Sequence, residues 1–281
     1  MPDPQEIAPF GAYLSNLLGR PRSGRPPAIL QTLYELHQEL EGATTVTSAN
    51  EIILRAAGVM DREMPRVRTA LGGGVTPFST LRGYFLEQVA LTIAKITARR
   101  CDPGIIVRKF STGDGVITGL SIRYSRGSLP TPTEMSFRKD REDVILGFPR
   151  DLRLTDGAAE GDLTVTGQVV PFCVIACKIY IDATRLENVL AKARSILPSY
   201  AGVSFFVVSE WDALGSEWHG PHREILDALY APVDRLIFLR DGERPDNAEL
   251  QAESIAHPYR AEQLRAISNR IERAYENWAG R

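Results

Sequence analysis

The chain has 281 residues, of which 43% are hydrophobic and 24% are charged. These shares are close to the average of soluble globular proteins, and they exclude a disordered chain, a collagen and a coiled coil. The chain has 33 basic and 35 acidic residues, which leaves a net charge of -2. A balance so close to zero argues against a protein that coats nucleic acid without regard to sequence.

Three features of the sequence predict a cytoplasmic protein with reduced thiols. The chain has three cysteines, an odd number that does not suit a disulfide framework. The first residues, Met-Pro-Asp-Pro, lack the basic start and apolar core of a signal peptide. No apolar run approaches the roughly 20 residues of a membrane-spanning helix, so we expect no membrane partner.

The first hundred residues are predicted to be helical. Apolar residues recur at helical spacing over 28–41 and 79–98, and a glycine-rich break at 72–74 separates the two patterns. We therefore expect a helical N-terminal subdomain over 1–75 and a second unit over 76–281. The sequence pattern changes from helical to strand-like near residue 104. The stretches 104–108 and 115–123 are typical of strands bounded by turns.

The C-terminal half alternates strand and helix patterns. We expect two hairpin strands joined by a turn at Gly167-Gln168, and then a helix that a capping box, Thr184-x-x-Glu187, opens. Strands over 202–209 and 233–240 follow, with helices over 221–230 and 260–278. This order predicts an α/β fold with a mixed sheet.

The second hairpin strand ends in a lysine that needs a partner. Alternate side chains of a strand share a face, which groups Cys173, Ile175 and Cys177 on one side, and Val174, Ala176 and Lys178 on the other. Both cysteines are therefore expected in the core. A lysine beside apolar residues is costly unless an acid pairs with it. Asp162, at the start of the preceding hairpin strand, is the predicted partner.

These segments resemble a known nuclease family. Asp162-Leu-Thr-Val, followed by Val174-Ile-Ala-Cys-Lys178, a helix and a buried strand, is similar to the PD-(D/E)XK nucleases. The segments 178–187, 207–211 and 233–240, with Gly83-Tyr-Phe-Leu-Glu87 in the long helix, resemble type II restriction endonucleases. The resemblance covers roughly residues 160–241. It implies a restriction-endonuclease-like mixed β-sheet flanked by helices, with DNA-recognition insertions around 121–160.

The resemblance also implies a role for each matching residue. Asp162 corresponds to the metal-binding aspartate, although Gly161 stands where the motif has proline. Lys178 corresponds to the catalytic lysine, the carbonyl of Cys177 to a further ligand of Mg²⁺, and Glu87 to a supporting helix glutamate. The middle acid of the motif, a catalytic residue and a metal ligand, falls at Ala176.

Ala176 leaves three explanations open. An original glutamate could have been replaced, so that the chain binds DNA but cuts it poorly. The acid could instead have migrated to Glu187 or Glu87. The chain could also be a naturally inactive DNA-binding or partner subunit. One aspartate and a carbonyl are a poor cage for Mg²⁺, so the missing acid bears directly on activity.

Basic residues before the motif are candidates for contact with DNA. Arginine and lysine suit phosphate contacts, and arginine also suits readout of guanine edges. The candidates are Arg123, Arg126, Arg138 and Lys139. The alternative is a solvated loop whose charges are balanced by Glu134, Asp140, Glu142 and Asp143.

The sequence therefore predicts a Mg²⁺-dependent type II restriction endonuclease that cuts double-stranded DNA at a short specific site. Each nuclease unit cuts one strand, so the resemblance implies a dimer, either a homodimer or a pair of related subunits, and a cognate methyltransferase. Two other classes stay open: a catalytically silent DNA-binding or partner subunit, and an unrelated α/β protein whose sheet imitates the motif.

Overall fold

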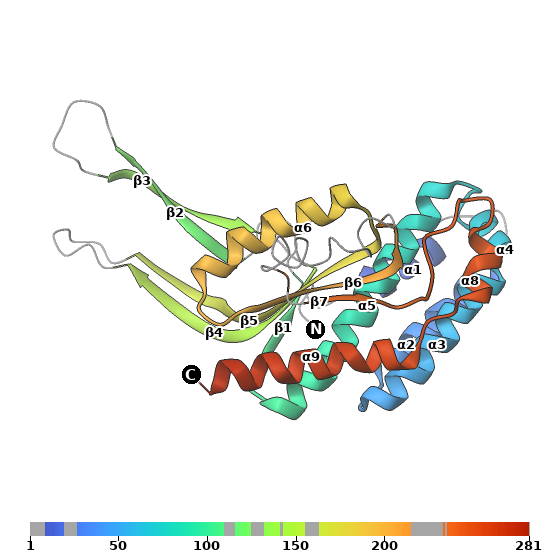
Figure 1. Ribbon diagram of the computed structural model, residues 1–281, viewed down its shortest axis with the longest axis horizontal. Helices are drawn as coiled ribbons and strands as arrows, with labels where there is room; N and C mark the ends of the chain where they lie inside the picture. Colours follow the sequence, from blue (N-terminus) through green and yellow to red (C-terminus); the bar gives the residue numbers. More distant parts are fainter. Residues whose placement is uncertain are drawn as a thin grey trace, which may run out of the picture.

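A computed structural model describes residues 9–19, 27–109, 116–124, 132–140, 143–154, 163–214, 233 and 235–280 (Figure 1). For 116–124, 132–140, 151–154 and 163–167 it describes the backbone and not the side chains. The predicted helix over 221–230 lies outside the described residues. None of the described helices is both long enough and apolar enough to span a membrane.

The centre of the fold is a mixed sheet of five strands in the order β1-β4-β5-β6-β7. The strands are β1 (Ile106–Arg108), β4 (Val144–Leu154), β5 (Leu163–Ile181), β6 (Ser204–Asp212) and β7 (Arg235–Phe238). The strands β1 and β5 both run antiparallel to β4, whereas β6 is parallel to β5 and β7 is parallel to β6. The predicted mixed α/β sheet is confirmed.

Helices cover both faces of this sheet (Figure 1). On one face, α6 (Ala183–Ile196) packs on an apolar cluster that includes Val174 and Ala176. On the other face, α5 (Val75–Cys101) and α9 (Ala261–Ala279) share a cluster with Cys173, Ile175 and Cys177. The alternation predicted for this strand is therefore confirmed, and both cysteines of β5 are buried as expected.

The helical N-terminal part packs against the same core as the sheet. It consists of α1 (Pro9–Leu18), α2 (Ala28–Glu41), α3 (Val46–Arg62) and α4 (Met64–Ala70). Their buried side chains join those of α5 and α9 in one continuous cluster. Gly72 and Gly73 follow α4 with φ of 94° and 81°, a backbone that favours glycine, and the chain then enters α5. The short helix α8 (Leu250–Ala256) lies against α3.

A second, two-stranded sheet includes the strand predicted over 115–123. It pairs β2 (Val116–Tyr124) with β3 (Pro132–Asp140) in antiparallel register. Figure 1 shows this ribbon projecting beyond the helical layers, beside the far ends of β4 and β5.

Two local predictions are wrong. The expected turn at Gly167-Gln168 does not form, because Leu163–Ile181 is one continuous strand whose antiparallel partner is β4. The expected capping box at Thr184 does not form either. The helix begins two residues earlier than that box implies, and the side chain of Asp182 caps it by accepting a hydrogen bond from the backbone N–H of Arg185 at 2.8 Å.

Candidate active site

Four segments of the chain bring charged side chains together near the C-terminal end of β5. Glu87 comes from the middle of α5, and Lys109 follows β1. Asp143 directly precedes β4, and Lys178 lies three residues before the end of β5. These residues are separated widely in sequence, and it is the sheet order β1-β4-β5 that makes them neighbours.

Hydrogen bonds join Asp143 to the end of the motif strand. The backbone N–H of Cys177 donates a hydrogen bond to Asp143 Oδ2 at 2.6 Å. Lys178 Nζ lies 3.4 Å from the same oxygen, and it donates to the carbonyl oxygen of Cys177 at 3.0 Å. The register explains this arrangement, because Val144 pairs with Ile175 and the residue before Val144 therefore faces the 176–178 segment. Among the described residues, Asp143 is an acid that lies beside Lys178.

Glu87 and Lys109 form an ion pair next to this group. Burial raises the pKa of the Glu87 carboxyl, and the negative charge of Asp143 raises it further, whereas Lys109 and Lys178 act in the opposite direction. Glu87 is 18% exposed and Lys109 is 27% exposed, so water screens these charges only in part. The four side chains therefore form one electrostatic unit of two acids and two lysines.

The chemistry of the donors suits a hard cation. Within the described parts of the chain, no three His, Cys, Asp or Glu side chains group closely enough to hold a metal ion. The two carboxylates and the carbonyl of Cys177 are nevertheless oxygen donors, the type that Mg²⁺ takes, and Mg²⁺ commonly completes its shell with water. The negative charge of Asp143 also raises the pKa of Glu87, and a bound cation would oppose that effect.

The site opens into a cavity of about 450 Å³. Glu87 and Lys178 line it together with residues from β5, α6, α5 and the segment after β7. The lining includes Arg82, Tyr180, Arg185, Trp211 and Arg244. A substrate that reaches Lys178 through this cavity would therefore meet several arginines.

The sequence-based candidates have different outcomes. Glu87, Lys178 and the carbonyl of Cys177 do come together, as described above. Asp162 lies outside the described residues, but the hairpin that was to carry it to Lys178 is absent. Its neighbour Leu163 pairs with Leu154, fifteen residues along β5 from Lys178, or about 50 Å in an extended strand.

Ala176 and Glu187 do not contribute side chains to this group. Ala176 is fully buried in the apolar cluster under α6. Glu187 is exposed on the outer side of α6.

Asp143 and Lys109 are the members of the site that sequence reasoning missed. Asp143 figures in the sequence-based predictions only in the alternative of a solvated loop, as one of the acids that balance its charges. The available signal was its position directly before the apolar run Val144-Ile-Leu. Only five of the 33 basic residues are lysines, and Lys109 is one of them. Because most basic positions of this chain carry arginine, a lysine is a signal that the position deserves a closer look.

Three of the four candidates for DNA contact lie on the projecting ribbon. Arg123 is on β2, and Arg138 and Lys139 are on β3, where they pair with Gly119 and Ile117. The side chains of these three residues are not described, and Arg126 lies outside the described residues. The described segments 121–124 and 132–140 therefore belong to a β-ribbon, whose register shifts at two places.

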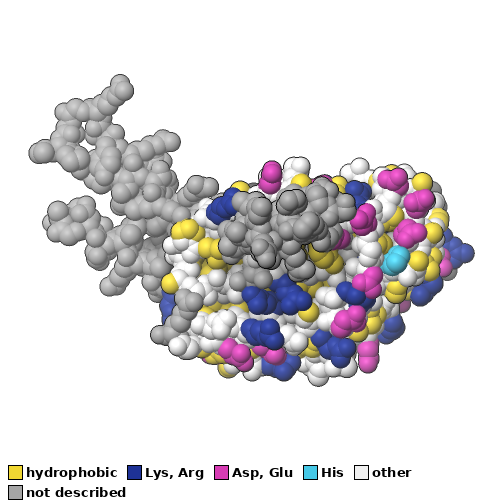
Figure 2. Space-filling view, viewed as in Figure 1, with side chains coloured by type: hydrophobic (Ala, Val, Ile, Leu, Met, Phe, Trp, Pro, Cys, Tyr) yellow, Lys and Arg dark blue, Asp and Glu magenta, His cyan; other side chains and the backbone are white. Residues whose placement is uncertain are grey.

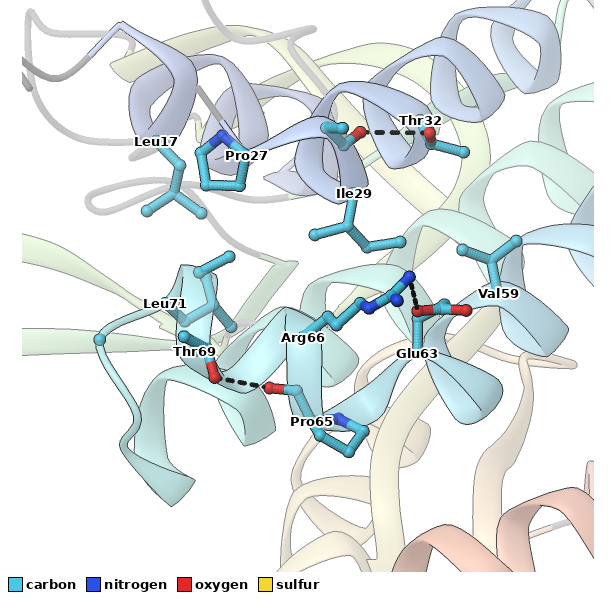
Figure 3. A pocket seen from close by; sticks show the side chains of 13 residues that line it. Leu17, Pro27, Ile29, Thr32, Val59, Glu63, Pro65, Arg66, Thr69 and Leu71 are labelled. Carbon is cyan, nitrogen blue, oxygen red and sulfur yellow. Dashed lines mark hydrogen bonds and ion pairs between the residues drawn. The ribbon is translucent and has the colours of Figure 1, made fainter. Parts of the chain in front are cut away.

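A larger groove of about 1070 Å³ lies in the helical part and is unrelated to this site. Figure 3 shows apolar side chains of α1, α2 and the α4 region around it, including Leu17, Ile29 and Leu71. The polar contacts drawn there are an ion pair between Arg66 and Glu63 at 3.0 Å and two hydrogen bonds from threonine hydroxyls to backbone carbonyls of their own helices. The groove therefore lacks the clustered acids and lysines of the β5 site.

Comparison with known proteins finds a similar fold. No family model and no curated protein matches the chain. Among solved structures, the chain is similar to BbvCI, a type II restriction endonuclease determined as its native A2B2 tetramer at low resolution. The two chains superpose with a TM-score of 0.57 at 15% sequence identity, over 90% of this chain and 88% of that chain. The fold is therefore restriction-endonuclease-like.

Proposed function

We propose that this protein is a Mg²⁺-dependent endonuclease of the type II restriction class, which hydrolyses phosphodiester bonds of double-stranded DNA at a short specific site. The observation that carries the proposal is the convergence of Glu87, Asp143 and Lys178 near the end of β5. The similarity of fold to BbvCI supports it.

Each charged residue of the site has a role in this proposal. Asp143, Glu87 and the carbonyl of Cys177 would hold Mg²⁺, which lowers the pKa of a bound water and offsets charge on the phosphate. Lys178 orients the attacking water and donates a hydrogen bond to a phosphate oxygen as negative charge develops there. Lys109 favours the ionised form of Glu87, because its positive charge opposes the rise in the pKa of that carboxyl that burial causes.

Among the three explanations for Ala176, migration of the acid to Glu87 has the strongest support. Glu87 lies in the electrostatic unit of Asp143 and Lys178, whereas Ala176 is enclosed by apolar side chains. The chain as written is therefore proposed to be active. The alternative is a catalytically impaired or silent subunit that binds DNA.

The projecting ribbon is the proposed recognition element. A two-stranded β-ribbon fits the major groove of DNA, where arginine reads guanine. Arg123, Arg138 and Lys139 lie on this ribbon, and Arg126 belongs to the segment between its strands. Because one nuclease unit cuts one strand, we propose a dimer of identical or related chains. A methyltransferase of the same specificity would protect the DNA of a cytoplasm that contains this enzyme.

The proposal is tested by incubating the purified protein with unmethylated plasmid and bacteriophage DNA, with Mg²⁺ or with EDTA. We expect discrete DNA fragments that appear only with Mg²⁺. We expect the Lys178→Ala variant to produce no such fragments. Binding of duplex DNA without cleavage, by a folded protein in the presence of Mg²⁺, would instead identify the silent subunit. The absence of both binding and cleavage would overturn the nuclease assignment.

A further inference from the structure

Two arginines enclose a tyrosine beside the candidate active site. The guanidinium carbon of Arg185 lies 3.8 Å from the ring centroid of Tyr180, and that of Arg244 lies 3.6 Å from the same centroid. Two guanidinium groups cannot both lie this close to one centroid on the same face without overlapping. Arg185 and Arg244 therefore stack on opposite faces of Tyr180.

Backbone contacts hold both arginines at this place. The N–H of Arg185 donates to Asp182 in the first turn of α6, and its guanidinium forms an ion pair with the same carboxylate. The backbone N–H of Arg244 donates at 2.6 Å to the carbonyl oxygen of Asp212, the last residue of β6. Both side chains are thus anchored at the C-terminal ends of the parallel strands β5 and β6, the edge where open α/β sheets bind ligands.

The position of the stack relative to Lys178 is fixed by the strand. Tyr180 follows Lys178 by two residues on β5, so both side chains leave the same side of the strand, about 7 Å apart. Tyr180, Arg185 and Arg244 line the cavity that also contains Lys178 and Glu87. A strand of DNA whose phosphate lies at Lys178 would therefore pass the two guanidinium groups.

The charges of the stack are not balanced locally. Arg185 shares the carboxylate of Asp182, but Arg244 forms no ion pair within the described residues and its side chain is exposed. Two like charges on opposite faces of one ring repel each other, and an anion beside them would relieve that repulsion. Figure 2 shows acidic and basic side chains interspersed over the face in view, so attraction for DNA depends on local groups such as this one.

We infer that Arg185 and Arg244, held apart by Tyr180, bind phosphates of duplex DNA next to the phosphate that is cut. The inference rests on the proposed function, because it assigns the substrate backbone to the same cavity. Guanidinium groups match phosphate geometry, and contacts of this kind position DNA without reading its sequence. The two arginines would thereby place one scissile phosphate at Lys178.

The test is the salt dependence of binding. A fluorescently labelled duplex is titrated with the protein in EDTA, which prevents cleavage, at several salt concentrations between about 50 and 200 mM. Each of Arg185→Ala and Arg244→Ala is expected to make the slope of log K against log salt shallower by about 0.9, with a five- to tenfold loss of affinity at about 0.1 M salt for every duplex sequence tried.

Three further variants separate a phosphate contact from a structural role. Arg55→Ala removes an exposed arginine of α3 that pairs with Glu39 and is expected to leave the slope unchanged. Tyr180→Leu removes the ring that supports both guanidinium groups and is expected to weaken binding, whereas Tyr180→Phe keeps the ring and is expected to bind as the unchanged protein does. Circular dichroism confirms that each variant is folded.

The outcomes distinguish this inference from the proposed function. If the unchanged protein binds duplex DNA with a steep salt dependence and both arginine variants keep that slope, the phosphate contact is wrong and the nuclease assignment stands. If the unchanged protein shows no salt-dependent binding at all, both are overturned.

Discussion

Nη2 of Arg240 lies 2.9 and 2.8 Å from the two carboxylate oxygens of Asp61, although 179 positions separate the two residues in sequence. Asp61 is on α3, and Arg240 follows β7. The side chain of Arg240 is 1% exposed and that of Asp61 is 6% exposed. Arg240 Nη1 also donates to the carbonyl oxygens of Ser254 and His257, so one buried guanidinium ties the sheet to α3 and to the end of α8.

We expect Asp61→Leu to lower the free energy of unfolding by about 3–5 kcal/mol. The substitution leaves the Arg240 guanidinium buried without its carboxylate, and an uncompensated buried charge has a cost of this order. Urea denaturation measures the change. The matched control is Arg55→Ala, which breaks an exposed ion pair with Glu39 and is expected to cost less than about 1 kcal/mol. Equal effects of the two substitutions would contradict a structural role for the buried pair.

Asp143→Asn and Asp162→Asn separate the two candidate aspartates of the site. We expect Asp143→Asn to reduce Mg²⁺-dependent cleavage at least about a hundredfold, because it removes a carboxylate proposed to hold the cation beside Lys178. We expect Asp162→Asn to keep the rate within about threefold, since a loss below about 1 kcal/mol corresponds to no direct contact with the reacting group.

Initial rates on a plasmid with one cleavage site give the comparison. A hundredfold loss in Asp162→Asn with an unchanged rate in Asp143→Asn would restore the aspartate suggested by the family resemblance.

Ala176→Glu is expected to destabilise the protein and not to restore a catalytic acid. The side chain of Ala176 is enclosed by the apolar cluster under α6, so a carboxylate there would lose its hydration, and we expect a cost of at least about 3 kcal/mol at pH 7. Burial would raise the pKa of the new carboxyl in the folded state. The cost is therefore smallest below the ordinary pKa of glutamate and grows as the pH rises through the raised value.

Urea denaturation at pH 5 and pH 8 measures this dependence, with Thr184→Glu on the exposed start of α6 as the control. A stable Ala176→Glu protein that cuts DNA faster than the unchanged chain would support the replaced-acid explanation.

The three cysteines are expected to differ in their reactivity toward a thiol reagent. Burial raises the pKa of the Cys177 thiol well above its ordinary value, and the charges of Asp143 and Glu87 raise it further. Because the thiolate is the reactive form, a raised pKa leaves less of it at any pH below that pKa.

Native protein at pH 8 should therefore expose Cys101 alone, which is partly exposed, and Cys101 should react more slowly than a free thiol because burial raises its pKa too. Mass spectrometry of alkylated peptides locates the label, and unfolding in urea should release all three thiols. Rapid labelling of Cys177 in the native protein would contradict its burial.

The elements that follow simple periodicity were predicted well from sequence. The helices over 28–41, 79–98 and 260–278 correspond to α2, α5 and α9, because their apolar residues recur at helical spacing and α5 and α9 pack on the sheet. The strand over 202–209 corresponds to β6, whose residues are buried almost without interruption. Such patterns are local, and local sequence is sufficient to recognise them.

The site was predicted only in part because its geometry depends on strand pairing. Lys178 and Glu87 were identified by resemblance, but the acid beside Lys178 depends on which strand pairs with β5. A glycine at 167 favoured a turn, whereas tertiary pairing with β4 keeps the backbone extended through that glycine. Asp143 therefore became visible only when the register was known.

The 19-residue length of β5 also has a mechanical consequence. One end of the strand carries Lys178, and the other end lies in the part of the β4–β5 pair that projects past the helices in Figure 1. The strand is hydrogen-bonded to β4 over most of its length, so the distance between its two ends stays nearly constant. If the projecting end touches DNA, the cut would fall at a constant distance from that contact. Lengthening both β4 and β5 by two residues would then move the cleavage position without altering the chemistry.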